Sequence, residues 1–600
     1  MGFCPEPFLG THTELGLFAM KMITGIQGCA IITQVVLWKM LRRFHTIRRS
    51  YHSFYRSCHY FYFFAAFCAI FVLKICCSTS LPLHTMNRAY LLFPSLVVSI
   101  IVLFVPMTNL CAQQPDWAKV HSVTMSSIES LYNLNFEEAE ARANEVIKLA
   151  PQDPRGYFFR TMTYYYRFLY SRVSRLPQNE QDAEQQKFLG YAQQTISICE
   201  KFIQQNPNDS KSLFYIGGLH GYRGITLGFN ATKTSDYLTA ARDAQKGVDY
   251  LKRSLAIDPL NADAQMGLGL FNYIISQVPP FAQSVIKLAG MTGNRVEGLK
   301  QLEYAAANGV YARAEAQSWL AQIYSRGVLF TGGEGMFDRA EQHYTSFLTL
   351  YPGNTLIRFF YAGMLYDDLR RSQDAIKQYS AASDDKGRKV EFLAAASGNN
   401  QARILMAQGN FSGAIAVLQQ ALALRSDLQF LHYNFGICQE LQGNRAAAME
   451  SYAKAKDNEN AQKRIKTPFS EKEQQLMKAE WAFDCGDDTK AITLINECLK
   501  RTDLTNQERA DMHYLGGRAL AAKGDFKLAE AYYAQAIPLV GDDTQMKAQV
   551  FYHLGVAQGK NGKKPDAIGS LEQAQLLKEY PGERRLRRNI ERELYRLKRT

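Results

Sequence analysis

"GNFSGAIAVLQQALAL" (409–424) decides the fold, because "GNRAAAMESYAKAKDN" (443–458) repeats its pattern 34 residues later. A small, a large and a second small residue recur at helical spacing, at Ala414, Leu418 and Ala421 and again at Ala448, Tyr452 and Ala455. The helical segment before the second stretch, "LHYNFGICQELQ", carries a small residue, Gly436, twelve positions before Ala448. Self-similarity at a period near 34 residues predicts a stack of helix pairs.

The same pattern recurs along most of the chain. Regular copies have anchor alanines at Ala139, Ala340, Ala375, Ala491, Ala529 and Ala567. Less regular copies follow Thr195, Gly247 and Gly298, where the anchors are more than 34 residues apart. The excess predicts longer helices or insertions, and we expect insertions at "GITLGFNATKTSDY" (224–237) and at the glycine-rich "SRGVLFTGGEG" (325–335). The pattern predicts about eleven units between residues 119 and 581, degenerate in 119–325 and regular in 326–581.

These residues resemble tetratricopeptide repeats. The resemblance implies an all-α fold, a right-handed solenoid in which each unit is two antiparallel helices. Small residues at the crossing let the two helices approach, and a larger residue four positions later fills the remaining space. One unit cannot bury its own apolar face, so neighbouring units have to stack.

The segment 266–306, "MGLGLFNYIISQVPPFAQSVIKLAGMTGNRVEGLKQLEYAA", departs from a standard repeat. It resembles the Iml2-like inclusion-body clearance family of tetratricopeptide proteins, over about residues 210–325. The matching residues are Gly267, Gly269, Phe271, Ser276, Pro279, Pro280, Gly290, Gly293, Arg295, Gly298 and Leu302. Asn294 stands where the resemblance implies an aspartate. The resemblance implies intracellular protein or lipid handling without an established enzymatic activity, and it supports the fold more than the role.

Four apolar residues of this segment permit two interpretations. Phe271, Ile274, Ile275 and Phe281 either belong to a structural insertion that fills a seam of the stack, or they line an apolar pocket or a membrane-facing lid. The second interpretation makes the protein a carrier of lipid or another apolar ligand.

Residues 86–112 have the parts of a secretory signal peptide. A short basic start at Arg88 precedes the apolar run Tyr90–Val105, and the small residue Ala112 follows as the predicted cleavage site. The run is also near the lower length limit for a membrane span, so an uncleaved anchor is the alternative. A lipoprotein cysteine at Cys111 is disfavoured because Thr108–Leu110 are not the small residues that such a site needs.

Residues 1–85 form an apolar, basic extension with two further apolar stretches. They are interpreted either as sequence upstream of a true start at Met86, or as a membrane hairpin with a basic loop. Cleavage of the signal predicts export to the cell envelope, in the periplasm or on the periplasmic face of the outer membrane. Retention of the spans predicts a membrane-anchored scaffold, associated with the membrane through its N-terminus.

The charge of the chain is concentrated at its two ends. Residues 1–112 carry nine basic and two acidic residues, and residues 578–600 carry nine basic and four acidic ones, of a total net charge of +13. The body is therefore nearly neutral, which argues against nucleic acid as a partner. The C-terminal segment 582–600 has apolar residues at helical spacing, which predicts a basic capping helix. Its basic face is either solvated or contacts acidic lipid or a partner.

The chain offers no sign of catalysis. It contains no phosphate-binding glycine loop, no HExxH, no GxSxG and no dinucleotide fingerprint. The cysteines after residue 112, at positions 199, 438, 485 and 498, form no CxxC pair. We expect no enzyme, no cofactor and no metal.

Binding of a protein partner is the remaining function. The first helix of each repeat lines a concave groove in the family that the chain resembles, which predicts an inward-facing set at Phe360, Met364, Arg403, Tyr433, Ile437, Tyr514, Arg518 and Tyr552. An aromatic stripe with two arginines suits an extended peptide or a partner helix. Packing between repeats is the alternative role for the aromatic residues. The sequence therefore predicts a non-enzymatic interaction scaffold.

Overall fold

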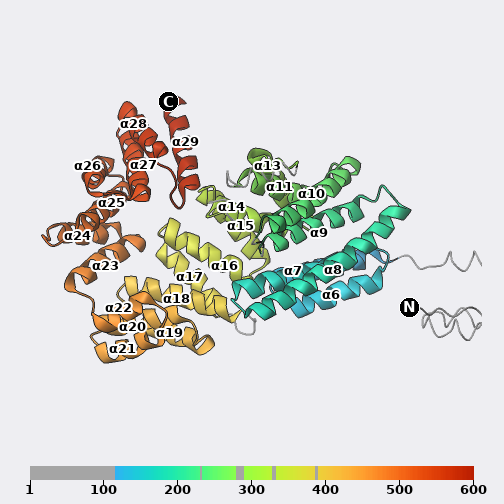
Figure 1. Cartoon of the computed structure of the whole chain (residues 1–600), viewed down its shortest axis with the longest axis horizontal. Coiled ribbons are helices and arrows are strands. Elements are labelled where there is room, and N and C mark those ends of the chain that lie inside the picture. The colour runs from blue at the N-terminus through green and yellow to red at the C-terminus, as the bar shows by residue number, and fades with distance from the viewer. Residues whose placement is uncertain are drawn as a thin grey trace, which may run out of the picture. The chain divides into compact units, whose positions relative to one another are not determined.

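Helices make up the regular structure of the chain, and no strand occurs in the residues that the structure describes (Figure 1). The computed structural model describes residues 115–599 except 230, 232, 279–289, 328–332 and 385–389. All of them belong to one compact unit, Pro115–Thr600. The predictions for residues 1–112, including the cleavage site at Ala112, and for Phe281 lie outside the described residues.

The first six helix pairs cover residues 117–383. They are α5 (Trp117–Tyr132) with α6 (Phe136–Leu149), α7 (Arg155–Val173) with α8 (Gln178–Gln205), α9 (Ser210–Phe229) with α10 (Thr234–Ile257), α11 (Ala262–Ser276) with α13 (Arg295–Asn308), α14 (Arg313–Tyr324) with α15 (Phe337–Leu350), and α16 (Thr355–Gly363), extended by the π-helix η1 (Met364–Asp368), with α17 (Ser372–Ser383). Helices as long as α8, with 28 residues, account for much of the excess over the 34-residue period.

The two expected insertions differ in outcome. The stretch 325–335 joins α14 to α15, so it is a connection inside a unit, as its glycines predict. The stretch 224–237 is mostly helical, because α9 continues to Phe229 and α10 begins at Thr234. The prediction of an insertion there is wrong. Gly224 lies inside α9, where its lack of a side chain lets α10 pack closely: a Cβ at Gly224 would lie 2.9 Å from the Ala240 carbonyl oxygen of α10.

Five further pairs cover residues 391–576. They are α18 (Glu391–Ala407) with α19 (Phe411–Leu424), α20 (Gln429–Leu441) with α21 (Arg445–Lys454), α23 (Glu471–Asp484) with α24 (Asp488–Leu499), α25 (Asn506–Ala522) with α26 (Phe526–Ala536), which a short 3₁₀ turn η2 (Ile537–Leu539) extends, and α27 (Thr544–Lys560) with α28 (Lys564–Leu576). A single helix, α22 (Glu459–Lys466), interrupts this series, and α29 (Glu583–Arg599) ends it.

The anchor residues of the repeat pattern form the core of each pair. Ala414, Leu418, Ala448 and Tyr452 are all fully buried. A Cβ at Gly436 would lie 2.4 Å from Tyr452 Cε1, so α20 and α21 approach this closely only because that position has no side chain. Small residues at the crossing therefore set the distance between the two helices of a unit.

The Iml2-like segment follows the same rule with glycine. A Cβ at Gly269 of α11 would lie 2.9 Å from the Gly298 carbonyl oxygen of α13, and a Cβ at Gly298 would lie 2.7 Å from that of Gly269. Asn294 caps α13, because its Oδ1 accepts hydrogen bonds from the backbone N–H groups of Val296 (3.0 Å) and Glu297 (3.1 Å). An aspartate would make the same cap, so the departure from the family pattern leaves the helix start intact.

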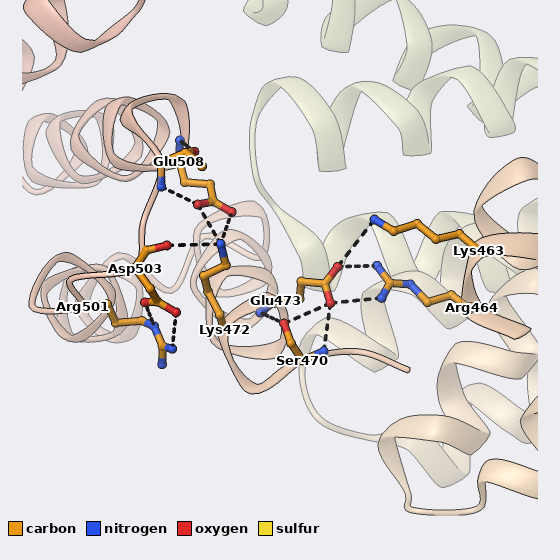
Figure 2. A network of polar contacts seen from close by, with 9 residues as sticks. Lys463, Arg464, Ser470, Lys472, Glu473, Arg501, Asp503 and Glu508 are labelled. Atoms are coloured by element: carbon orange, nitrogen blue, oxygen red, sulfur yellow. Dashed lines mark hydrogen bonds and ion pairs between the residues drawn. The ribbon is translucent and has the colours of Figure 1, made fainter. Parts of the chain in front are cut away.

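A polar network bridges the place where the single helix α22 breaks the series (Figure 2). Arg464 of α22 donates to both carboxylate oxygens of Glu473 in α23, at 3.1 and 2.8 Å. Glu473 also closes a capping box with Ser470, and Lys472 reaches Glu508 of α25 at 3.1 Å. Contacts between charged groups therefore join α22 to α23 and α23 to α25 at this junction.

Units far apart in sequence also touch. The Nδ2 of Asn354, which caps α16, donates to the Tyr132 carbonyl oxygen at 2.7 Å. Arg370, just after η1, forms an ion pair with Asp488 of α24 at 2.5 Å. The second contact places η1 beside α23 and α24, and the candidate site lies at this place.

Candidate functional site

The predicted inward-facing residues fall into two groups, one buried and one with exposed surface. Met364 is fully buried, and Ile437 and Tyr514 are 6% and 7% exposed. These three side chains are core residues, because each packs inside a hydrophobic cluster, so a partner does not reach them in this structure. Sequence position gives the direction of a side chain on the helix but not its depth in the stack.

The other five predicted residues keep exposed surface. They are Phe360 on α16, Arg403 on α18, Tyr433 on α20, Arg518 on α25 and Tyr552 on α27, of which Arg403 is the most open. They do not form one continuous stripe of contacts. Tyr433 lies apart from the arginines, with its ring centroid 6.0 Å from that of Tyr452.

Asp484, the last residue of α23, is the point on which several units converge. Burial raises the pKa of its carboxyl, and the positive charges of Arg403, Arg518 and Arg370 act against that rise. The three arginines come from α18, from α25 and from the turn after η1, and α18 packs directly against α23. Two of the predicted residues, Arg403 and Arg518, thus act electrostatically on a carboxylate that the sequence did not single out.

Phe483, next to Asp484, lies between two guanidinium groups. The Cζ of Arg370 is 4.2 Å from the centroid of its ring and that of Arg518 is 4.7 Å away. Arg370 is neutralised by Asp488, whereas no carboxylate lies within ion-pair distance of Arg403 or Arg518 in the described part of the chain. Cation–π contacts hold Arg518 in place without neutralising its charge.

Aromatic rings continue from Arg518 toward α27. The Arg518 guanidinium is 5.7 Å from the Tyr514 ring, and the His553 ring lies 5.7 Å from that of Tyr514 and 5.0 Å from that of Tyr552. Burial, together with the charge of Arg518, lowers the pKa of His553 to about 3. The histidine is therefore neutral at physiological pH and serves as an aromatic surface.

The helices α23 and α25 also carry acidic groups. Burial raises the pKa of Glu480 on α23 to about 7, and the negative charges of Asp484 and Asp511 add to the rise, although solvent still reaches the Glu480 side chain. Burial also raises the pKa of Asp511 on α25. The surface between α23 and α25 is thus of mixed charge, with two guanidinium groups available beside it.

The residues of the apolar segment are described only in part. Phe271, Ile274 and Ile275 are half-buried on α11, and the first two pack against the main core. This arrangement agrees with a structural role, and the interpretation as an apolar-ligand site stays a prediction.

Sequence reasoning missed Arg370, Phe483 and Asp484. Asp484 is the last residue of α23, and Arg370 follows η1 in a turn, with a positive φ of 54°. Nothing local distinguishes them, because their juxtaposition depends on contacts between units that are distant in sequence. Asp487 caps α24, whereas its neighbour Asp488 binds Arg370.

Two features are absent from the described residues. Among them, no group of three or more histidine, cysteine, aspartate or glutamate side chains is arranged to hold a metal ion. In the same part of the chain, no helix combines the length and the apolar character that a membrane span needs.

Comparison with protein families identifies the repeats. A model of tetratricopeptide repeats matches residues 399–462, so the chain is a tetratricopeptide repeat protein. The model of Iml2/Tetratricopeptide repeat protein 39 matches residues 189–395, so its central segment is Iml2-like. The search of curated proteins finds no match.

Solved structures of repeat proteins resemble the chain at low identity. YrrB, described as a TPR protein with an unusual peptide-binding site, is 17% identical over 36% of this chain and 95% of its own, with a TM-score of 0.18. Yeast Tom70 is 12% identical over 80% and 96%, with a TM-score of 0.22, and human IFIT1 is 16% identical over 72% and 96%, with a TM-score of 0.27. At these values none of them carries an argument about function.

Proposed function

We propose that this chain is a non-enzymatic scaffold that binds a protein partner on the surface around Arg403, Asp484 and Arg518. One observation carries the proposal: two guanidinium groups without an ion-pair partner in the described residues lie on first helices of repeats, and that of Arg518 lies beside the Phe483 and Tyr514 rings. Arginines without an ion-pair partner are ready to bind carboxylates, since a guanidinium binds a carboxylate with two parallel hydrogen bonds.

The chemistry of the surface defines the kind of partner. An extended segment or a helix with one or two acidic side chains would pair with Arg403 and Arg518, and an apolar residue beside them would meet Tyr552. The acidic groups at Glu480 and Asp511 disfavour a uniformly acidic partner, because like charges would lie close together. The repeats hold these groups on rigid helices, so little conformational entropy is lost on binding.

Co-purification from the native host tests the proposal. We expect Arg403→Ala with Arg518→Ala to reduce the recovery of at least one specific partner by about tenfold or more, the effect of losing two charged hydrogen-bonding groups. The matched control is Arg253→Ala with Lys527→Ala, which removes two exposed basic residues from the second helices α10 and α26. Equal recovery of every partner by both variants would refute the proposed surface.

We also propose export to the cell envelope, directed by residues 86–112. The support is the order of a basic start, an apolar run and Ala112 in the sequence. Mass spectrometry of the mature protein tests it. A first residue near Gln113 would support export and cleavage, and peptides from residues 1–85 would support the membrane-anchored alternative.

A further inference from the structure

The last helix, α29, makes contacts through two of its faces. Its apolar residues Ile590, Leu594 and Leu597 are buried against the last repeat, in a cluster with Leu571 and Ala574 of α28. This face is the expected cap of the solenoid. Figure 1 shows that the opposite side of the helix is directed to the units around α13 and α14.

The other face of α29 is a row of arginines at every fourth position. Arg584 donates to the Gln277 carbonyl oxygen at the end of α11. Arg588 donates to Gln277 Oε1 at 2.8 Å and to Glu334 Oε1 at 3.3 Å, and Arg592 donates to the Glu334 carbonyl oxygen at 2.8 Å. The basic face is therefore not simply solvated, because it joins the C-terminus to residues more than 250 positions earlier.

Glu334 is the centre of this contact and is fully buried. It also accepts a hydrogen bond from the Tyr273 hydroxyl at 2.8 Å and binds the Arg295 guanidinium. Burial alone would raise the pKa of Glu334, but the hydrogen bond from Arg295 and the charges of Arg588 and Arg295 outweigh it and lower the pKa. Arg588 thus belongs to a buried ionic network that would be left incomplete if α29 moved away.

The same helix lies at the border of the candidate site. Arg585 forms an ion pair with Asp368 of η1 at 3.2 Å, and Asp367 beside it acts electrostatically on Asp484. At the other side, Tyr552 packs against the apolar cluster that α29 completes. One helix therefore contacts η1 and α27, the two elements that border the surface around Arg518.

We infer that α29 is a releasable clasp, which fastens the last repeat to the Iml2-like segment through Glu334 and controls access to the surface around Arg403 and Arg518. The control of access rests on the proposed function, whereas the clasp itself does not. The segment 577–582 between α28 and α29 contains Gly582 in a left-handed conformation, with a φ of 80°, and forms the connection on which the helix would swing.

Hydrogen exchange of the full-length chain tests the clasp without a partner. In Arg588→Ala we expect the amides of α29 and of residues 333–336 to exchange about tenfold faster or more, while α24 keeps its protection. Arg599→Ala is the matched control, since Arg599 is exposed at the end of the same helix and contacts only Tyr595 among the described residues. Unchanged exchange of α29 in Arg588→Ala would overturn the clasp.

A second variant keeps the test decisive if Arg588→Ala unfolds the chain. Arg592→Ala removes an exposed side chain with its hydrogen bonds to the Glu334 backbone and to Asn589 within α29, and we expect faster exchange confined to α29 and residues 333–336. Co-purification with the clasp variants then separates the two proposals. If exchange is faster but partner recovery is unchanged, the proposed scaffold stands and the control of access by α29 is refuted. If only the variant with Arg403→Ala and Arg518→Ala loses its partners, that result bears on the binding surface and not on the clasp.

Discussion

The regular units of residues 337–576 and the irregular ones of residues 117–324 hold their helices together in different ways. In the regular units, small and apolar anchors such as Ala448 and Tyr452 fill the crossings. In the irregular units, carboxylates are buried as well: Glu315 of α14 is 5% exposed and accepts hydrogen bonds from Tyr132 at 3.2 Å and Trp319 at 3.3 Å. Buried charge stays in a protein only when hydrogen-bonding partners surround it.

The junction of α22 and α23 shows that the repeat pattern, rather than position in the chain, explains this difference. It lies in the regular half, yet it is held by Arg464 and Glu473 as in Figure 2. Glu315, Glu334 and Glu473 have in common that each lies where the 34-residue pattern is stretched or interrupted. At these places directional polar contacts act in addition to the small residues that set the distance between helices.

The largest expected effect is on the buried carboxylate of the irregular half. Glu315→Ala would leave the hydroxyls of Tyr132, Tyr166 and Tyr222 and the Trp319 indole without their acceptor. We expect a loss of about 3–5 kcal/mol in the opening free energy of α5, α7, α9 and α14, measured by hydrogen exchange. Glu450→Ala, at an exposed position of α21, should change little. A loss below about 1 kcal/mol in Glu315→Ala would contradict the role given to buried charge.

The counterpart in the regular half is a change of size. Gly436→Ala would place a Cβ 2.4 Å from the ring of the fully buried Tyr452. We expect destabilisation of α20 and α21 by about 1–3 kcal/mol because the core has to shift. Hydrogen exchange of these two helices measures it, and unchanged protection would mean that their crossing is looser than described.

The junction should respond to acid. The hydrogen bonds from Arg464, opposed by burial and aided by Ser470, lower the pKa of Glu473 to about 2. A carboxyl with a lowered pKa in the folded state stabilises the fold above its unfolded value, near 4.5, and the contribution is lost as the pH falls toward about 2. Because the side chain is partly exposed, we expect Glu473→Gln to cost about 1–2 kcal/mol at pH 7 and progressively less below pH 4.5. An equal cost at pH 7 and at pH 2.5, measured on α22 and α23, would contradict this account.

The smallest effect is a stabilisation that sharpens the contrast with Gly436. Gly569 lies inside α28 with nothing within 4 Å of an added Cβ. Gly569→Ala should stabilise α28 by about 0.5–1 kcal/mol, because alanine loses less backbone entropy than glycine in a helix. Thermal unfolding of Gly569→Ala and of Gly436→Ala, measured side by side, tests whether the first variant is stabilised and the second destabilised. A destabilised Gly569→Ala would mean that space around glycine does not decide these effects.

Local periodicity predicted the all-α fold and the anchor positions, because each anchor depends on residues three or four positions away. It also assigned Arg403 and Arg518 to an inward-facing set, and this assignment stays a prediction. It did not predict that Tyr514 is buried under neighbouring rings, nor that Arg588 reaches Glu334, 254 residues away in sequence. Such contacts depend on how the units wind around one another, and no single repeat contains that information.

Photo-crosslinking in the native host tests the central claim most directly. A light-activated side chain replaces Glu480, an exposed residue of α23 at this surface, in one full-length variant and Lys527, on the outer helix α26, in another. The account predicts a crosslink from position 480 to one specific protein, lost when Arg403→Ala and Arg518→Ala are added, and none to that protein from position 527. Crosslinks to the same proteins from both positions, or a crosslink from position 480 that Arg403→Ala with Arg518→Ala does not weaken, would contradict binding at this surface.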